Sequence, residues 1–244
     1  MTLIDQLLAG ITEDAAVRSV LVGAHWTAVC SRHCGLASTI IGDQPHGHSV
    51  VRDAGQLHFK SALELAEYAR SDNPLEVSSG LAAINSLIEF DQARAVEVNA
   101  AEVLARSGRE KTVAVIGHFP FVTKLQSQVG RLWVIEQRPI AGEYPAEAAD
   151  DLLPRADVVA ITGTTLINGT LDHLLALCQS TAVVMILGPS TPLSPVLFEH
   201  GVSLIAGARV IDEVAALNGV RQGAIFQQMK GVQLLTLAHA DWLL

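Results

Sequence analysis

Two side chains with acid–base or metal-binding chemistry follow neighbouring apolar segments of the sequence. His118 comes directly after the run TVAVIG, and Glu136 ends the next apolar run, RLWVIE. An imidazole and a carboxylate can exchange protons with a substrate or hold a metal ion. We predict His118 as a catalytic residue, and both side chains as ligands of a transition or heavy metal ion. The alternative for His118 is a hydrogen bond to a loop carbonyl with no further function.

Polar side chains near the starts of two later helices could bind the anionic part of a ligand. Thr164 and Asn168 lie in ITGTTLINGTLDHLLALC, and Ser190 lies in the proline-rich segment LGPSTPLSP. The free N–H groups at a helix start attract anions, so these three residues are predicted to bind ligand. They could equally cap helices with no ligand present. The segment RPIAGEYP at 138–145 could cover the same site, or could be an ordinary surface loop.

Several common enzyme motifs are missing from the sequence. The residues after the 112–116 run are GHFPFV, so the G-x-G-x-x-G fingerprint of dinucleotide-binding proteins is absent at this position. NAD is therefore not expected as a cofactor. The chain also contains no G-x-S-x-G, no G-K-[ST] and no H-E-x-x-H sequence.

A third group of reactive side chains is the segment CSRHC, which contains Cys30, His33 and Cys34. Thiols and an imidazole could bind a thiophilic metal, but no second pair of such residues completes a four-ligand structural zinc site. The alternative is two small apolar residues that flank a turn. With Cys178 the chain has 3 cysteines, and this small odd number favours reduced thiols over a disulfide framework.

The elements that must position His118 and Glu136 follow a pattern of strands alternating with helices. Four apolar runs, each followed by polar or glycine-rich residues, lie at 113–116, 132–135, 158–161 and 183–187. This pattern predicts a Rossmann-like, doubly wound parallel sheet in an α/β fold. Because ligands bind beyond the carboxyl ends of such strands, the four ends should converge on one crevice.

The first 90 residues predict a smaller α+β domain. A helix at 2–9 precedes a strand over 17–30 and a second strand over 34–41, which together indicate an antiparallel hairpin. Helices are expected at 61–70 and 74–90 after a polar loop, and a further helix over 91–108 should connect the two parts. The predicted domains are residues 1–90 and 91–244.

Composition restricts the classes of partner. Half of the 244 residues are hydrophobic, which suffices for a substantial core, and the net charge is −9. An acidic chain without a basic stripe is not expected to bind nucleic acid or an anionic membrane. No apolar run approaches the roughly 20 residues of a membrane span, and the start does not resemble a signal peptide. We therefore expect a cytoplasmic protein that binds a small molecule or metal ion, with a homo-oligomer as a plausible assembly.

Taken in order, these segments resemble a family of uncharacterised prokaryotic proteins associated with heavy-metal chelation. The N-terminal resemblance is carried by VGAHWTAVC, CGLAST and SSGLAAINSLI, and the C-terminal one by VAVIGHFPFV, VIEQRP, ITGTTLINGTLDHLL and GPSTPLSPVLFEHGVSLIAGARV. The resemblance covers nearly the whole chain. It implies a domain like the enolase N-terminal fold, a Rossmann-like domain after it, and an active-site cleft between the two. It implies no ligand role for Cys30 or Cys34.

The leading functional hypothesis is a cleft between the domains that binds a metal ion or a metal-bearing small molecule. From the N-terminal domain, His25 on the first strand and Asn85 on the 74–90 helix are predicted to lie nearest to the ligand. A second hypothesis is a metal-independent lyase or isomerase that uses His118 as its base. A third is a non-catalytic interaction protein, which would need a large exposed apolar patch.

Overall fold

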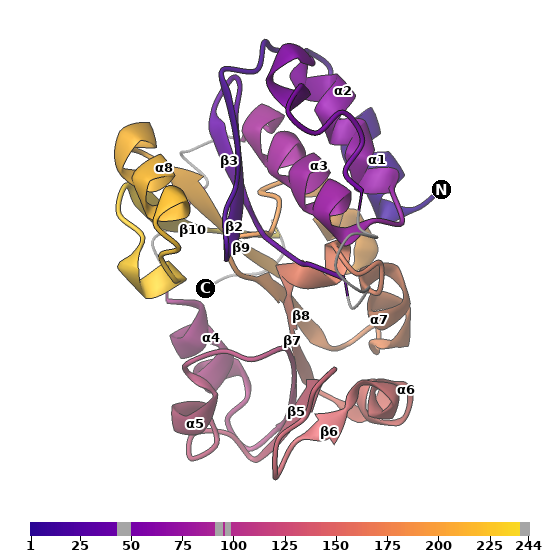
Figure 1. Ribbon diagram of the computed structural model, residues 1–244. Helices are drawn as coiled ribbons and strands as arrows, with labels where there is room; N and C mark the ends of the chain where they lie inside the picture. The colour runs from indigo at the N-terminus through magenta and orange to yellow at the C-terminus, as the bar shows by residue number, and fades with distance from the viewer. Residues whose placement is uncertain (43–49, 91–94, 96–98, 240–244) are drawn as a thin grey trace.

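The computed structural model describes residues 1–42, 50–90, 95 and 99–239, and it contains two β-sheets (Figure 1). A three-stranded antiparallel sheet lies in the N-terminal part, and a seven-stranded, mostly parallel sheet forms the centre of the C-terminal part. The predicted α/β class with a parallel sheet is confirmed. The polar loop predicted before the 61–70 helix lies largely outside the described residues.

The N-terminal part consists of a helix, three antiparallel strands and further helices that pack on them. Its elements are α1 (Leu3–Ala9), β1 (Ser19–Val22), β2 (Trp26–Cys30), β3 (Cys34–Ser38), α2 (Ala62–Ala66) and α3 (Pro74–Leu87), with 3-10 turns at Leu57–Phe59 and Glu67–Arg70. Two predicted helix starts are confirmed by their caps. Thr2 caps α1 and Ser61 caps α2, each through a reciprocal capping box.

Two sequence expectations for the boundaries of elements are wrong. The single strand predicted over 17–30 is broken, because Gly23 N donates to Trp26 O (2.9 Å) and closes a turn between β1 and β2. The helix predicted over 91–108 begins only at α4 (Ala100–Ser107), where the Asn99 side chain accepts from the backbone of the first turn. Most of the preceding segment, 91–94 and 96–98, lies outside the described residues.

The C-terminal part is built around the large sheet, whose strand order is β10-β9-β8-β7-β4-β5-β6. All neighbouring strands are parallel except β10, which is antiparallel to β9. The strands are β4 (Thr112–Ile116), β5 (Arg131–Glu136), β6 (Tyr144–Pro145), β7 (Val158–Thr162), β8 (Val183–Leu187), β9 (Leu204–Val210) and β10 (Val232–Ala238). The helices are α5 (Val122–Leu125), α6 (Ala149–Leu152), α7 (Leu171–Leu177) and α8 (Glu213–Arg221). The four predicted strands are thus confirmed.

The order of the strands reverses at β4. The chain places β5 and β6 on one side of β4, and then returns to place β7 on the other side. The segments that leave β4 and β7 consequently run toward opposite halves of the sheet. Such a switch point opens a crevice at the carboxyl ends of the strands, where open α/β sheets bind their ligands.

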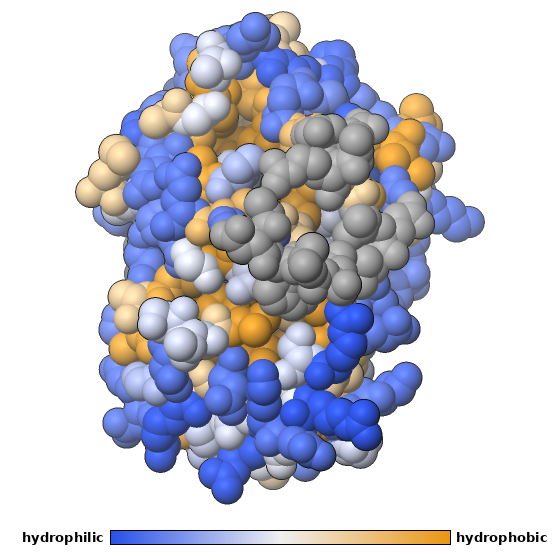
Figure 2. All heavy atoms as spheres, turned by 180° about the vertical axis from the view of Figure 1, so that it is seen from behind, coloured by the Kyte–Doolittle hydropathy of each residue, from blue (hydrophilic) through white to orange (hydrophobic). Residues whose placement is uncertain are grey.

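One buried apolar cluster joins the two parts of the molecule. It contains Leu3 and Leu81 from the N-terminal helices, together with Ala114, Ile161 and Ile186 from one face of the large sheet. Figure 2 shows apolar side chains gathered across the middle of one side of the molecule, with hydrophilic residues toward both ends. The N-terminal helices therefore complete the core of the large sheet. Among the described residues, no helix has the length and apolar character needed to span a membrane.

Candidate functional site

A cavity of about 510 Å³ opens at the carboxyl ends of β4, β5 and β7. Its walls include His118 after β4, Glu136 at the end of β5, and Thr164 and Asn168 after β7. Ile40, which follows β3, is the one described lining residue from the first 90 residues. Three of the four predicted strand ends thus converge on one cavity, whereas the residues after β8 are not among its lining.

Gly117 turns the chain from β4 into the cavity wall. Its φ of +107° lies in the region that residues with a side chain rarely adopt. A Cβ at this position would also lie only 2.8 Å from Thr162 Cγ2, at the end of β7. The turn therefore requires glycine both for its conformation and for its close approach to β7. As a result of this turn, His118 lies at the cavity wall, and about half of its side chain is exposed.

His118 lies between two carboxylates that face different nitrogens of its ring. Its Nε2 lies 2.7 Å from Glu143 Oε1, and its Nδ1 lies 3.5 Å from Glu136 Oε1. The Glu143 side chain is 9% exposed, and its second oxygen accepts from Ile140 N (2.9 Å). Glu143 is therefore held in place by its own loop while it fixes the imidazole. This contact brings the segment 138–145 to the site, as the sequence allowed, but Glu143 was not predicted as a site residue.

Thr164 and Asn168 line the cavity, but both also stabilise the local turns. The Thr164 hydroxyl donates to Thr162 Oγ1 (3.1 Å), and Asn168 Oδ1 accepts from the Thr170 hydroxyl (2.7 Å). The helix-capping role that was the alternative to ligand binding belongs to neither residue, because Thr162 caps the 3-10 turn after β7 and no side-chain hydrogen bond caps α7. Their position in the cavity wall still lets them contribute polar surface to a ligand.

A second histidine–carboxylate pair also lines the cavity. His173 Nε2 is 2.7 Å from Asp150 Oδ1, and both side chains are well exposed. Both residues line the cavity, and neither was predicted from the sequence as a site residue. His173 lies within the segment ITGTTLINGTLDHLLALC, yet nothing in its spacing indicates that it would meet Asp150 on a separate helix. Only the packing of α6 beside α7 brings the pair together.

Three predicted ligand-binding residues lie away from the cavity. His25 is an exposed residue of the turn between β1 and β2, rather than a strand residue. The Asn85 amide donates to Leu36 O (2.8 Å) and Ser190 O (3.3 Å). Ser190 is 1% exposed, and its hydroxyl both accepts from Ser38 N and donates to Ser38 Oγ. Asn85 and Ser190 therefore connect the N-terminal part to the loop after β8.

Ser190→Ala is expected to destabilise the fold by about 1–3 kcal/mol, because it leaves the part-buried Ser38 N–H without its acceptor. Urea unfolding followed by circular dichroism measures this loss. Ser127→Ala is the matched control, since the Ser127 hydroxyl makes one exposed hydrogen bond to Lys124 O. Equal stability of both variants would contradict the role of Ser190 as a structural connection.

The cysteines depart from the expectation of reduced thiols. Cys30 and Cys34 form a disulfide, because the β2–β3 register places them directly opposite each other. Cys178 is free, and burial raises the pKa of its thiol to about 11. His33 points to Glu89, with its Nε2 3.1 Å from Glu89 Oε1. The CSRHC segment therefore does not present its histidine and its two sulfur atoms to one point.

Comparison with known proteins identifies relatives along nearly the whole chain. A family model described as putative heavy-metal chelation matches residues 99–238, and a second model with the same description matches residues 4–88. An uncharacterized protein of Methanocaldococcus jannaschii is 30% identical over 190 residues, which cover 75% of this chain and 72% of that protein.

Two solved structures of relatives with unknown function share the fold. The structure from Desulfitobacterium hafniense has a TM-score of 0.84 and 29% sequence identity, covering 97% of both chains. The structure from Pyrococcus horikoshii has a TM-score of 0.82 at 22% identity and covers 97% of this chain and 98% of that one. The architecture is therefore common to proteins whose sequences differ at most positions.

Proposed function

Because this chain belongs to the family described as putative heavy-metal chelation, we propose that its cavity binds a metal ion carried by a small polar molecule. His118 Nδ1 and Glu136 Oε1 are the two protein ligands in this proposal. Glu143 orients the imidazole, and Thr164 and Asn168 provide polar surface for the small molecule. The proposal rests on one observation, the placement of His118 between the two carboxylates.

The distances around His118 fit a metal ligand held by an outer carboxylate. Two ligands at about 2.0–2.1 Å from one tetrahedral ion lie about 3.4 Å apart. The 3.5 Å between His118 Nδ1 and Glu136 Oε1 is close to that separation. In this proposal the Nε2 proton lies on the side of the Glu143 carboxylate, 2.7 Å away, and the lone pair of Nδ1 binds the metal ion. Metal-binding histidines commonly donate their second N–H to a carboxylate in this way.

The size of the cavity favours a ligand larger than a bare ion. Two protein ligands leave at least two coordination positions of a tetrahedral ion for other donors. A volume of about 510 Å³ has room for a small organic molecule that supplies them. His173 and Asp150, which also line the cavity, could then contact the organic part through hydrogen bonds. The proposed activity is thus the binding or processing of a metal complex.

His118→Ala is expected to weaken binding of Zn²⁺ or Cd²⁺ by about a hundredfold, and Glu143→Gln by about tenfold, since outer-shell partners contribute factors of 10–100. Protein without a histidine tag would be titrated with the metal alone by isothermal calorimetry, with the Cys30–Cys34 disulfide intact. Metal content after anaerobic purification would be measured by mass spectrometry.

His173→Ala provides the matched control, because it removes a second histidine–carboxylate pair from the same cavity without removing a proposed metal ligand. The affinity of His173→Ala for the free ion should stay within about twofold of the wild-type value. This change is much smaller than the loss of affinity, about tenfold or larger, expected when a metal ligand or its supporting carboxylate is removed. If His118→Ala keeps its fold and binds metal as tightly as the wild type, the metal assignment is wrong.

The second candidate is a metal-independent lyase or isomerase that uses the same cavity. The observation that favours it is again the His118–Glu143 contact, because a carboxylate that orients an imidazole also prepares it as a general base. Activity on a small organic substrate that survives exhaustive chelation and is lost in His118→Ala would support this candidate over metal binding.

A further inference from the structure

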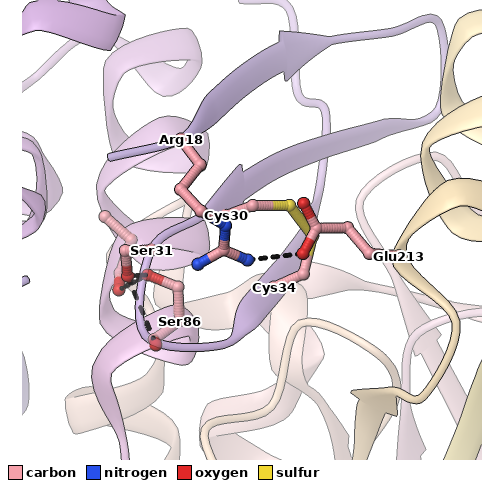
Figure 3. The surroundings of a disulfide bond; sticks show 7 residues. Arg18, Cys30, Ser31, Cys34, Ser86 and Glu213 are labelled. Carbon is pink, nitrogen blue, oxygen red and sulfur yellow. Dashed lines mark hydrogen bonds and ion pairs between the residues drawn. A yellow bond between two sulfur atoms is a disulfide. The ribbon is translucent and has the colours of Figure 1, made fainter. Parts of the chain in front are cut away.

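Cys30, Cys34 and Glu213 come together outside the cavity, where α8 packs against the small sheet (Figure 3). One ligand atom from each of the three side chains lies within 4.8 Å of the other two. Within the described ranges, this is the one cluster of three or more histidine, cysteine or acidic side chains with such close ligand atoms. Glu213 lies in the first turn of α8, and its carboxylate faces the two sulfur atoms.

The backbone holds the two cysteines together by contacts that do not involve sulfur. Cys30 and Cys34 are direct partners in the β2–β3 register. The turn between them is fixed to α3, because His33 N donates to Ser86 O (3.0 Å) and the Ser31 and Ser86 hydroxyls are 2.5 Å apart. Reduction of the disulfide would therefore leave both thiols facing the same point. Rotation of their side chains can provide the separation of about 3.8 Å that two thiolates on one metal ion require.

The surroundings of the cluster suit a soft cation bound to thiolates. The sulfur atoms lie among apolar side chains that include Trp26, Leu36 and Leu217, with Cys30 fully buried. Glu213 keeps 38% of its side chain exposed, which offers a route from solvent. Two thiolates and one carboxylate carry three negative charges, of which a divalent cation neutralises two. The remaining charge faces Arg18, whose guanidinium already pairs with Glu213.

We propose that Cys30, Cys34 and Glu213 form a redox-controlled binding site for a thiophilic divalent cation. The disulfide closes the site, because each sulfur is bonded to the other. A dithiol reductant opens it by exchange: the S–S bond breaks, two electrons and two protons pass to the sulfurs, and the reductant becomes a disulfide. The cation then displaces the two thiol protons into the solvent and forms two metal–sulfur bonds and one metal–oxygen bond.

The test is a Cd²⁺ titration of the protein after reduction with dithiothreitol and anaerobic removal of the reductant. The reduced wild type should develop the ultraviolet charge-transfer absorbance of cadmium–thiolate bonds, with an amplitude that corresponds to one thiolate-bound ion per chain. The oxidised wild type should not. His118→Ala should behave as the wild type, which separates this site from the proposed cavity function. Cys178→Ser is the matched cysteine control and should also leave the absorbance unchanged, since that thiol lies elsewhere.

Three variants assign the ligands. Cys30→Ser should abolish the absorbance, and Cys34→Ser should do the same if the first variant does not fold. Glu213→Gln should keep the absorbance but bind Cd²⁺ at least about tenfold more weakly, the scale on which neighbouring groups alter metal affinity. The proposal is overturned if the reduced wild type, with its free thiols verified, shows no charge-transfer absorbance. It is also overturned if Cys30→Ser or Glu213→Gln binds as the wild type does.

Discussion

Gly35→Ala should destabilise the protein by about 3 kcal/mol or more, at the upper end of the effects of overpacking a core. Gly35 lies in β3 at its contact with α3. A Cβ there would be 2.1 Å from Ala82 O and 2.4 Å from Ser86 N, both backbone atoms of α3. Backbone atoms cannot move aside as a flexible side chain can, so the helix must shift away from the sheet. Urea unfolding monitored by circular dichroism would measure the loss of stability.

The control for this prediction is Gly10→Ala. Gly10 ends α1 with a φ of −75°, which alanine adopts readily, and its Cβ would meet no atom closer than 3.5 Å. The cost should therefore stay below about 1 kcal/mol. If Gly35→Ala unfolds at the same urea concentration as Gly10→Ala, the contact between β3 and α3 is looser than the structure describes. Loss of this contact would also disturb the core that the two parts share.

Glu76→Gln is expected to cost about 2 kcal/mol at pH 7, the scale of hydrogen bonds to a charged group. The Glu76 side chain is 3% exposed, and its carboxylate accepts from Arg52 N (2.6 Å) and Arg52 Nε (2.9 Å). Burial alone would raise the pKa of Glu76, but hydrogen bonds from Ser71 and Arg52 outweigh it and hold the pKa below the ordinary 4.5. The charged form is thus the one that the fold stabilises.

The sign of the pH dependence follows from that lowered pKa. The contribution of Glu76 is fully present above its ordinary pKa of 4.5, and it is lost as the pH falls through the lower pKa of the folded state. The stability difference between wild type and Glu76→Gln should therefore shrink when urea unfolding is repeated at pH values descending below 4.5. A difference that stays constant over that range would contradict the assignment.

Glu102 provides the matched control for Glu76. Both are glutamates at the third position of a helix that an asparagine caps, Asn73 for α3 and Asn99 for α4. Glu102 is exposed, so Glu102→Gln should change stability by no more than about 0.5 kcal/mol. The comparison separates the effect of burial and of Arg52 from the general preference for acidic residues near a helix start.

The sequence by itself determined the features that depend on neighbouring residues. The apolar run before Gly117 predicted β4, and local patterns predicted the helices that begin after Thr2 and Ser61. The alternation of strands and helices predicted the parallel sheet, and with it the edge at which His118, Glu136, Thr164 and Asn168 meet. These predictions succeed because hydrogen bonds within a turn and the periodicity of a strand depend on the types of a few consecutive residues.

Only the tertiary structure decided which side chains reach one another across elements. Nothing local connects Glu143 with His118 or Asp150 with His173, because each pair meets only when separate segments pack together. Ser190 was predicted to bind ligand, but its hydroxyl instead accepts a hydrogen bond from the backbone N–H of Ser38, a residue 152 positions away in the chain. No local pattern indicates this contact either. The register of two strands placed Cys30 opposite Cys34, and the packing of α8 brought Glu213 to them. Contacts between distant residues depend on how whole faces are buried, which no short stretch of sequence specifies.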